Sequence, residues 1–246
     1  MQCVILAGGK GKRLRPLTNS IPKPLVPVAG KPLLDHIVSV LPSEVEELII
    51  VHGYRGQQIK DHCGSSYYGR PVTYVEQKEQ KGTGHALWLT KDLVRGKFLY
   101  MFADDLHGAD DIARAVSYPR SILTLPTDKP ERFGIVSHDD DGILLDIIEK
   151  PENPPSNLAS TGVFVLDENI FAYPPTTETN GELVHVDMIR EYAKLHPMQV
   201  VKQNFWHPVG YPEDVVSAEA VLHSREEQKS GLEETVNLAR SSYSMG

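Results

Sequence analysis

Apolar residues in the first half of the chain gather in short, nearly continuous runs, and stretches of helical periodicity lie between them. Four such runs, at positions 3–7, 48–51, 72–75 and 98–102, have the length of buried strands. Positions 33–41, 57–63 and 86–93 repeat their apolar residues as helices do, and Pro32 stands at the start of the first. Continuous apolar strands that alternate with helices are typical of a parallel sheet covered on both faces. We therefore predict an α/β fold with a doubly wound, mixed but mostly parallel sheet.

The second half of the chain has a different pattern, in which strand-like runs are joined by short connections. These runs lie at 121–125, 134–137, 143–148, 162–166 and 198–202, and residues 139–142 have the composition of a hairpin turn. Helical periodicity returns at 181–195 and at 212–223. We predict a small β-rich subdomain here, within one domain over residues 1–222. The polar residues 223–246 are expected to form an exposed helix, a contact in a homo-oligomer or a tail.

Composition sets limits on this picture. With 246 residues, 40% of them hydrophobic, the chain can bury a large core. No apolar run approaches the ~18 residues that span a membrane, and the N-terminus lacks the features of a signal peptide. The two cysteines, Cys3 and Cys63, allow neither a disulfide framework nor a zinc site, which fits a reducing compartment. We expect a cytoplasmic protein that does not bind membranes.

Charge is distributed unevenly along the chain. The net charge of −8 argues against nucleic acid as a partner. Residues 1–34 nevertheless carry six cations and no acidic residue, whereas the remainder holds 19 cations against 33 acidic residues. A basic segment in an acidic protein is typical of a local anion site.

The basic segment follows the first predicted strand and contains three glycines, Gly8, Gly9 and Gly11. Glycines let the backbone approach a bulky ligand and turn its N–H groups toward it. Positive charge is added by Lys10, Lys12, Arg13 and Arg15. The loop is no Walker A motif, and Leu14 stands at the third glycine position of the dinucleotide fingerprint. The pattern indicates a phosphate cradle of another kind, with a tight turn and a solvated basic face as the alternative.

Two further residues could complete a phosphate site. Lys23 stands between Pro22 and Pro24 in the segment 16–32, whose prolines predict a stiff, extended backbone. Asp104 follows the predicted central strand, and ligands of open α/β sheets bind at that end of the strands. A carboxylate that faces phosphates there favours Mg²⁺, with a helix cap as the alternative role and Asp105 as a second candidate.

A second group of residues offers contacts to a sugar. Glu149-Lys150-Pro151 ends another predicted strand and supplies a hydroxyl acceptor and a cation, although such a pair is commonly a solvated surface feature. Gly134, Ser160 and Thr161 are small or polar positions that could line the same site. No Ser-His-Asp or Cys-His arrangement stands out, so no protein nucleophile is expected. Cations, a metal and positioning without a nucleophile indicate phosphoryl or nucleotidyl transfer.

The order of these features resembles the sugar-1-phosphate nucleotidylyltransferase family over residues 1–222. Leu-Ala-Gly-Gly-Lys-Gly-Lys-Arg-Leu at 6–14, followed by Pro-Lys-Pro-Leu at 22–25, is similar to the family's signature loop. Glu-Gln-Lys-Gly-Thr-Gly-His-Ala-Leu at 79–87 is similar to the uridylyltransferase domains that make UDP-N-acetylglucosamine. Val-Gly-Tyr-Pro-Glu-Asp at 209–214 matches the family's final loop and helix. The resemblance implies a Rossmann-like fold and a Mg²⁺-dependent transferase.

The resemblance also implies roles for the site residues. Arg13, Lys23 and Asp104 would be catalytic, because Arg13 would hold the triphosphate and the leaving pyrophosphate and Asp104 would bind the metal. Lys23 would lie between the nucleotide and the sugar phosphate. The nucleotide would be bound by Leu6, Ala7, Gly8, Gly9, Gly11, Arg13, Gln77, Gly82 and Thr83, of which Gln77 and Gly82 would read the base. The sugar phosphate would be bound by Gly134, Glu149, Lys150, Ser160 and Thr161.

The sequence departs from the family pattern at two positions. Pro208 stands where the family often has a second metal ligand, Asp or Asn, and it offers no side-chain ligand. Asp105 or water would then replace that ligand, or metal binding would be weaker. Ser160 stands where the family has Asn before Thr-Gly. No left-handed β-helix follows in this sequence, so we expect no attached acetyltransferase activity.

The expected reaction moves a nucleoside monophosphate from UTP or dTTP to a sugar 1-phosphate of the glucose or N-acetylglucosamine type, and it releases pyrophosphate. The expected partners are thus an NTP and a sugar 1-phosphate. Within the same fold, GTP with mannose 1-phosphate, an N-acetylmuramate 1-phosphate acceptor, and CTP with a phospho-alcohol stay open. A catalytically silent, nucleotide-sugar-binding regulatory subunit also stays open, because Pro208 favours it.

Overall fold

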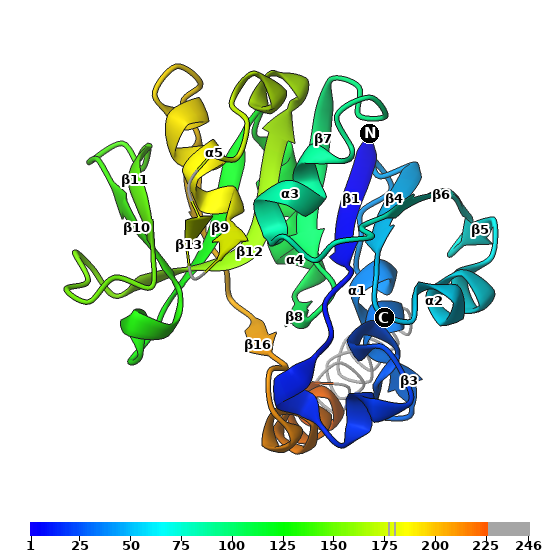
Figure 1. The fold of residues 1–246 in the computed structure, drawn as a ribbon. Helices are drawn as coiled ribbons and strands as arrows, with labels where there is room; N and C mark the ends of the chain where they lie inside the picture. Colours follow the sequence, from blue (N-terminus) through cyan, green and yellow to red (C-terminus); the bar gives the residue numbers. More distant parts are fainter. Residues whose placement is uncertain (177, 180, 226–246) are drawn as a thin grey trace, which may run out of the picture.

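The computed structural model describes residues 1–176, 178–179 and 181–225, which form an α/β fold around one large mixed sheet (Figure 1). The sheet follows the order β11-β10-β12-β7-β1-β4-β6-β5, and β9, which pairs with β12, also pairs with β15. Its strands are β1 (Gln2–Ala7), β4 (Glu47–His52), β5 (Ser66–Tyr67), β6 (Arg70–Glu76), β7 (Lys97–Phe102), β9 (Ser121–Pro126), β10 (Gly134–His138), β11 (Leu144–Glu149), β12 (Leu158–Asp167) and β15 (Gln199–Lys202). The predicted α/β class and doubly wound, mostly parallel sheet are confirmed.

Strand β12 joins the two halves of the sheet. Strands β7, β1, β4 and β6 run parallel, whereas β12 runs antiparallel to β7, β9 and β10. The register of β12 with β9 shifts between Ser160 and Phe164, and Gly162 in this stretch has a φ of +80°. A Cβ at Gly162 would lie 2.6 Å from the Phe102 ring, so only glycine fits where β12 passes from β7 toward β10.

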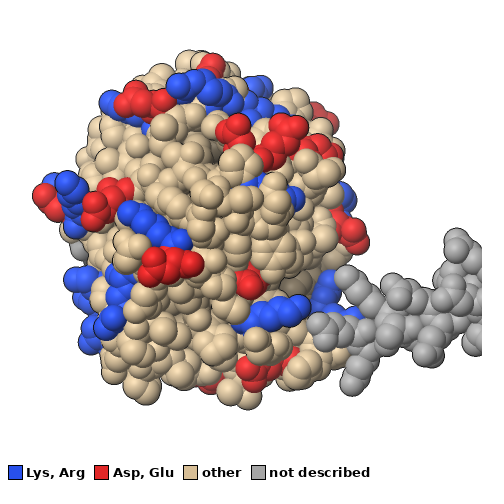
Figure 2. All heavy atoms as spheres, turned by 90° about the vertical axis from the view of Figure 1, so that its right-hand side faces the viewer, with Lys and Arg blue, Asp and Glu red and all other residues tan. Residues whose placement is uncertain are grey.

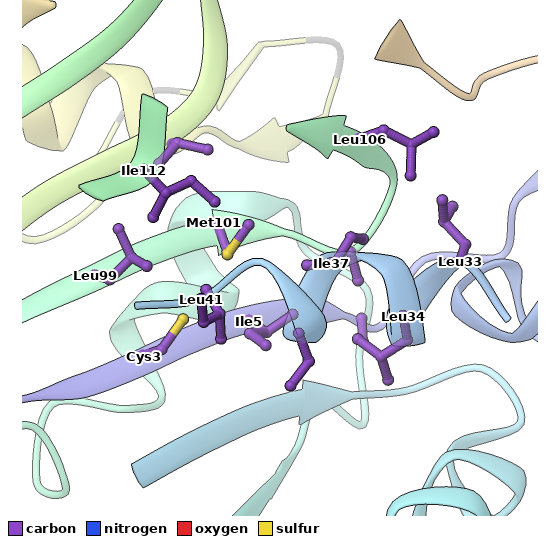
Figure 3. Packing of buried hydrophobic residues seen from close by; sticks show 14 of the residues in the cluster. Cys3, Ile5, Leu33, Leu34, Ile37, Leu41, Leu99, Met101, Leu106 and Ile112 are labelled. Carbon is purple, nitrogen blue, oxygen red and sulfur yellow. The ribbon is translucent and has the colours of Figure 1, made fainter. Parts of the chain in front are cut away.

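Helices cover both faces of the sheet because successive strand residues point to opposite sides. Cys3 and Ile5 of β1 pack in one core with α1 (Leu33–Ser39), α2 (Gly56–Cys63), α4 (Ala109–Ser117) and the helical residues 212–225. Figure 3 shows side chains of β1, β7 and α1 meeting in this core. Val4 points to the other face, where a second core includes α3 (Thr83–Trp88) and α5 (His185–Ala193).

Some predicted elements have different bounds in the structure. The helix expected over 181–195 begins only at His185, because β14 (Glu182–Leu183) pairs with β13 (Glu178–Thr179). The helix expected over 86–93 is α3, which begins and ends earlier. Helix α4 has no counterpart among the predicted helices, although its residues Ile112 and Ala115 are buried.

The segment 16–32 is not simply extended, which corrects the prediction made from its prolines. It contains two 3₁₀ turns, Leu17–Asn19 and Lys23–Leu25, and the short antiparallel pair β2 (Pro27–Val28) and β3 (Lys31–Pro32). Pro22 does have an extended backbone, and it introduces the turn that carries Lys23.

Several short elements lie below the carboxyl ends of the central strands (Figure 1). Strand β16 (Trp206–Pro208) pairs with β8 (Asp105–His107), and residues 212–225 are helical. The backbone N–H of Ala29 donates to Glu219 Oε1 at 3.1 Å, which ties this last helix to the basic segment. The predicted boundary at residue 222 falls inside this helix, and most of the predicted polar segment, 226–246, lies outside the described residues.

Charged residues of both signs are spread over the face that Figure 2 shows. Lysines and arginines there lie among acidic residues and do not form one continuous basic area. None of the described helices is long and apolar enough to cross a membrane. Both cysteines are free and buried.

Candidate active site

The carboxyl ends of β1, β6 and β7 open into a cleft with two adjoining compartments. One compartment, of about 800 Å³, lies against the glycine loop after β1, and we call it the nucleotide-side compartment. The other, of about 520 Å³, lies against β10, β11 and β12, and we call it the sugar-side compartment. Arg13, Lys23, Asp104 and Lys150 line both, so cations gather where the compartments meet.

Every site residue predicted from the sequence lines this cleft. The nucleotide-side compartment is lined by Leu6, Ala7, Gly8, Gly9, Gly11, Arg13, Gln77, Gly82 and Thr83. The sugar-side compartment is lined by Gly134, Glu149, Lys150, Ser160 and Thr161. The structure thus brings together residues that are up to 155 positions apart in the sequence, while their roles stay predictions.

The glycine loop owes its shape to close backbone contacts. Gly8 O accepts hydrogen bonds from Gln80 Nε2 at 2.8 Å and from the backbone N–H of Tyr54 at 3.2 Å. Gly11 has a φ of +58°, and a Cβ there would lie 2.9 Å from Thr18 Cγ2. A Cβ on Gly9 would meet nothing within 4 Å, so this glycine faces open space. The loop can therefore present backbone N–H groups to a phosphate chain.

Lys23 and Asp104 form an ion pair at the junction of the compartments. Lys23 Nζ lies 2.9 Å from Asp104 Oδ2, and 12% of the lysine side chain and 37% of the aspartate side chain are exposed. Lys23 comes from its 3₁₀ turn after Pro22, and Asp104 follows β7. The pair places one cation and one carboxylate where the two compartments join.

The Asp104 carboxylate fits a magnesium ion that takes few ligands from the protein. Asp104 and Asp105 supply oxygen donors at the cleft, and no cluster of three or more His, Cys, Asp or Glu residues that could hold a metal occurs in the described part of the chain. Mg²⁺ commonly uses one or two carboxylates, with phosphates and water as its other ligands. The protein would thus contribute Asp104, and the substrates would complete the site.

Asp105 is less suited to a metal than Asp104. Its Oδ2 accepts a hydrogen bond from Trp206 Nε1 at 2.8 Å, and burial and then the Asp104 charge raise the pKa of its carboxyl to about 8. Pro208 pairs with Asp105 across β8 and β16, so the family's second ligand position lies beside it with no donor side chain. The Asp105 carboxylate, which the sequence suggested as the replacement ligand, is therefore already hydrogen-bonded to Trp206.

The sugar-side residues differ in how much of each side chain is free. Lys150 Nζ pairs with Glu149 Oε1 at 3.0 Å, and 57% of the lysine side chain is exposed. Lys150 has a φ of +44°, an uncommon backbone for lysine. The Thr161 hydroxyl is buried and bonds Leu123 O at 3.1 Å and Gln203 Oε1 at 3.2 Å. Thr161 can therefore reach a ligand only through its backbone.

The predicted base-reading residues are held by a short network. Gln77 is 6% exposed and donates from Nε2 to Gly82 O at 2.9 Å. Gly82 has a φ of +97°, and a Cβ there would lie 2.4 Å from Leu183 O, so β14 closes over this glycine. Thr83 Oγ1 lies 2.8 Å from His185 Nδ1, so the Thr83 hydroxyl is engaged with α5.

Several cleft residues were missed by the sequence analysis. The guanidinium carbon of Arg13 lies 5.2 Å from the Tyr211 ring centroid, and that of Arg132 lies 5.5 Å from it. Trp206 packs edge-on against Phe133 at 5.0 Å between centroids. Further lining residues that were not predicted are Glu182, Val184, His185 and Val186. The adjacency of Arg132 and Phe133 to Gly134 was the available signal, whereas nothing local marks His185.

The comparison with protein-family models agrees with this geometry. The model for nucleotidyl transferases matches residues 2–225. The chain belongs to the nucleotidyl transferase family. The resemblance inferred from the signature loop is thereby confirmed.

Curated relatives of this nucleotidyl transferase carry related names. The chain is 35% identical over 226 residues to the bifunctional protein GlmU of Methanocaldococcus jannaschii, covering 90% of this chain and 54% of that protein. It is 34% identical over 242 residues to UTP–glucose-1-phosphate uridylyltransferase AglF of Haloferax volcanii, covering 93% of this chain and 99% of that protein. The chain thus spans about half the length of the GlmU relatives and nearly all of AglF.

Solved structures give the same result. A putative glucose-1-phosphate thymidylyltransferase from Bacillus anthracis has a TM-score of 0.79 and 26% sequence identity, covering 90% of this chain and 94% of that chain. A UDP-glucose pyrophosphorylase complexed with UDP-glucose has a TM-score of 0.78 and 25% identity, covering 91% of this chain and 98% of that chain.

Proposed function

We propose that this chain transfers a nucleoside monophosphate from an NTP to a sugar 1-phosphate and releases pyrophosphate. The Lys23–Asp104 pair carries the proposal, because it lies where the nucleotide-side and sugar-side compartments join. A protein that only bound nucleotide would leave Glu149, which lines only the sugar-side compartment, without a role. The names of AglF and of the two structural neighbours support the same reaction class.

In this reaction an oxygen of the sugar phosphate attacks the α-phosphorus of the NTP. The bond from that phosphorus to the oxygen that bridges to the β-phosphate breaks, and pyrophosphate leaves with the electron pair. Lys23 and Lys150 would offset the charge of the incoming sugar phosphate, and Arg13 with the glycine loop would bind the leaving pyrophosphate. Bringing two polyanions together is costly, so the cations at the junction lower the barrier by charge neutralisation and positioning.

Asp104 would hold Mg²⁺, which would supply charge stabilisation for the reacting phosphate. Lys23, through its bond to Asp104 Oδ2, would hold the carboxylate in one orientation.

Gln77 suits a base with an N3–H donor, such as uracil or thymine. Its Nε2 is committed to Gly82 O, so its Oε1 is the atom left to accept a hydrogen bond. Uracil and thymine carry an N3–H donor, whereas cytosine has an acceptor at N3. We therefore propose UTP or dTTP as the nucleotide, and glucose 1-phosphate or N-acetylglucosamine 1-phosphate as the acceptor class.

Pyrophosphate release tests the proposal directly. The purified chain with Mg²⁺ is offered UTP, dTTP, CTP, GTP or ATP with a panel of sugar 1-phosphates, and pyrophosphate is measured by a coupled assay. We expect release with UTP or dTTP only when a sugar 1-phosphate is present. If no combination of NTP and sugar 1-phosphate releases pyrophosphate, the proposed transferase activity is refuted.

Pro208 favours a second candidate, a catalytically silent subunit that binds nucleotide sugars. Its position beside Asp105 offers no metal ligand, and Asp105 itself is bonded to Trp206. Calorimetry separates the two candidates, because a silent subunit would bind UDP-glucose yet release no pyrophosphate from any substrate pair.

A further inference from the structure

His185 lies where the second core meets the sugar-side compartment. It is the first residue of α5, and its ring packs edge-on against Tyr100, Phe102 and Phe164 at centroid distances of 5.7, 5.1 and 5.4 Å. Only 7% of the residue is exposed, and burial lowers the pKa of its imidazole to about 3. The ring is therefore neutral at neutral pH and carries a single ring proton.

Thr83 determines which ring nitrogen carries that proton. Its Oγ1 accepts a hydrogen bond from the backbone N–H of His185 at 3.2 Å and lies 2.8 Å from Nδ1. The hydroxyl has one proton to donate, and Nδ1 is the acceptor within its reach, so we assign the bond as Thr83 to Nδ1. In a neutral imidazole whose Nδ1 accepts, Nε2 is the N–H donor.

The Nε2 donor is free to meet a ligand. No residue that the structure describes accepts a hydrogen bond from it. His185 lines the sugar-side compartment but not the nucleotide-side one. Phe102, Val184 and Val186 line the same compartment and offer no side-chain hydrogen bond of their own.

We propose that His185 is a specificity-determining residue that donates from Nε2 to an oxygen substituent on the ring of the sugar 1-phosphate. The proposal rests on the proposed function. A neutral donor suits a hydroxyl or an acetamido carbonyl oxygen, while the phosphate is matched by Lys23 and Lys150. Thr83 acts as a positioning residue, because it orients the ring and assigns its proton.

The apolar surroundings make this donor discriminating. A sugar that lacks an oxygen at the ring position facing Nε2 would leave the Nε2–H without a hydrogen-bond partner among apolar side chains. An unpaired buried donor is costly. Sites built to bond a substrate hydroxyl reject the analogue without it more strongly than apolar pockets reject a methylene. His185 thus gives this compartment a means of selecting among sugars of equal size.

Product binding tests the proposal without turnover. Calorimetry compares UDP, UDP-glucose and UDP-N-acetylglucosamine on the full chain and on His185→Phe. We expect the variant to bind at least one of the two nucleotide sugars about tenfold more weakly, with UDP affinity unchanged within about twofold. A panel of 2-, 3-, 4- and 6-deoxyglucose 1-phosphates then identifies the oxygen, because the variant should no longer distinguish one of these analogues from glucose 1-phosphate.

Matched variants separate recognition from packing. Tyr100→Phe removes a buried hydroxyl without a partner from the same ring cluster, so it should leave sugar discrimination unchanged. Thr83 also lines the nucleotide-side compartment, so its variants are compared by the ratio of nucleotide-sugar to UDP affinity: Thr83→Val should lower this ratio as His185→Phe does, whereas Thr83→Ser should retain it. Equal losses for UDP and both nucleotide sugars, or wild-type affinities in His185→Phe, would overturn the assignment. Failure of the proposed reaction shows separately, as a wild-type chain that releases no pyrophosphate, and a wild-type chain that binds no nucleotide sugar would overturn both.

Discussion

Individual residues in the loop after β1 make different contributions, although the sequence shows them as equivalent glycines. Gly11 has a left-handed backbone and no room for a side chain, whereas Gly9 has open space around it. The difference arises from Thr18 and Lys23, which fold back against Gly11 from the following 3₁₀ turns. A sequence motif of glycines therefore mixes a position required by the fold with a position that faces the cleft.

Gly11→Ala should destabilise the fold by about 1–2 kcal/mol, because an L-residue pays for the left-handed backbone and its Cβ would press on Thr18 Cγ2. Urea denaturation followed by circular dichroism measures the free energy of unfolding. Gly9→Ala is the matched control and should change it by less than about 0.5 kcal/mol. Equal effects of the two substitutions would contradict the conclusion that Gly11 is constrained by its backbone and by Thr18 while Gly9 is not.

Asp104→Asn should lower turnover by on the order of 10²-fold or more, because the amide removes the charge that pairs with Lys23 and that would bind the proposed metal. The thermal midpoint of unfolding should change little, since 37% of this side chain is exposed. Steady-state pyrophosphate release at saturating Mg²⁺ is the measurement, and the exposed Asp92→Asn is the control. Unchanged kinetics in Asp104→Asn would exclude Asp104 as the metal ligand.

At the scale of elements, α4 was missed, and it anchors the segment that forms one wall of the cleft. Asp111 in its first turn is 2% exposed and accepts hydrogen bonds from the backbone N–H groups of Asn204 and Phe205 at 2.9 and 3.0 Å. Arg114 Nη2 lies 2.6 Å from the same carboxylate. These bonds hold the chain that leads from β15 into β16, which carries Trp206 and Pro208.

Asp111→Ala should destabilise the protein by about 2–3 kcal/mol, since it leaves two backbone N–H groups without their acceptor. Amide hydrogen exchange at Asn204 and Phe205 should also be faster in the variant than in the wild type, whereas exchange in the central strands should change less. Asp110→Ala, at an exposed position of the same helix, should be nearly neutral. Protection at residues 204–205 equal to wild type would refute the anchoring role.

At the scale of the whole molecule, the two halves of the sheet are joined so that one cleft forms between them. The parallel strands β1, β6 and β7 bring the glycine loop, Gln77 and Asp104 to one edge, and β12 brings the sugar-side strands to the same edge. The second core, which includes α5, packs against this junction through the aromatic rings around His185. Burial of that neutral histidine links the stability of the whole fold to pH.

Stability should fall as the pH drops below about 6.5, the usual pKa of histidine in an unfolded chain. His185 has a pKa of about 3 in the folded state, so between these values the unfolded state binds a proton that the folded state does not. The cost reaches at most about 1.4 kcal/mol per pH unit. Urea denaturation at pH 7, 6 and 5 should show a steeper loss for the wild type than for His185→Phe. Parallel curves for the two proteins would contradict the buried, neutral state of His185.

The strand runs, the phosphate loop and the Glu149-Lys150 pair could be predicted because each depends on neighbours within a few residues. Burial on both faces makes a central strand apolar throughout, and a backbone that approaches phosphate needs glycine, so both leave a local mark. The bounds of α5, the turn at Lys23 and the presence of α4 left no such mark. The start of α5 depends on the pairing of β13 with β14, and the turn at Lys23 depends on packing against Gly11. Helix α4 is tied to the hydrogen bonds that Asp111 accepts near residue 204.

Local chemistry along the chain thus accounts for the central α/β sheet, the anion site and the class of reaction proposed for it. Folding decides which residues share the cleft, because contacts between positions far apart in sequence have no periodicity to reveal them. It places Pro208 and Trp206 beside Asp105. It also brings the guanidinium groups of Arg13 and Arg132 to the Tyr211 ring. The Thr83 hydroxyl lies next to His185 for the same reason. The donor that His185 presents to the sugar side exists only in that three-dimensional setting, since its tautomer and exposure both come from residues on other elements.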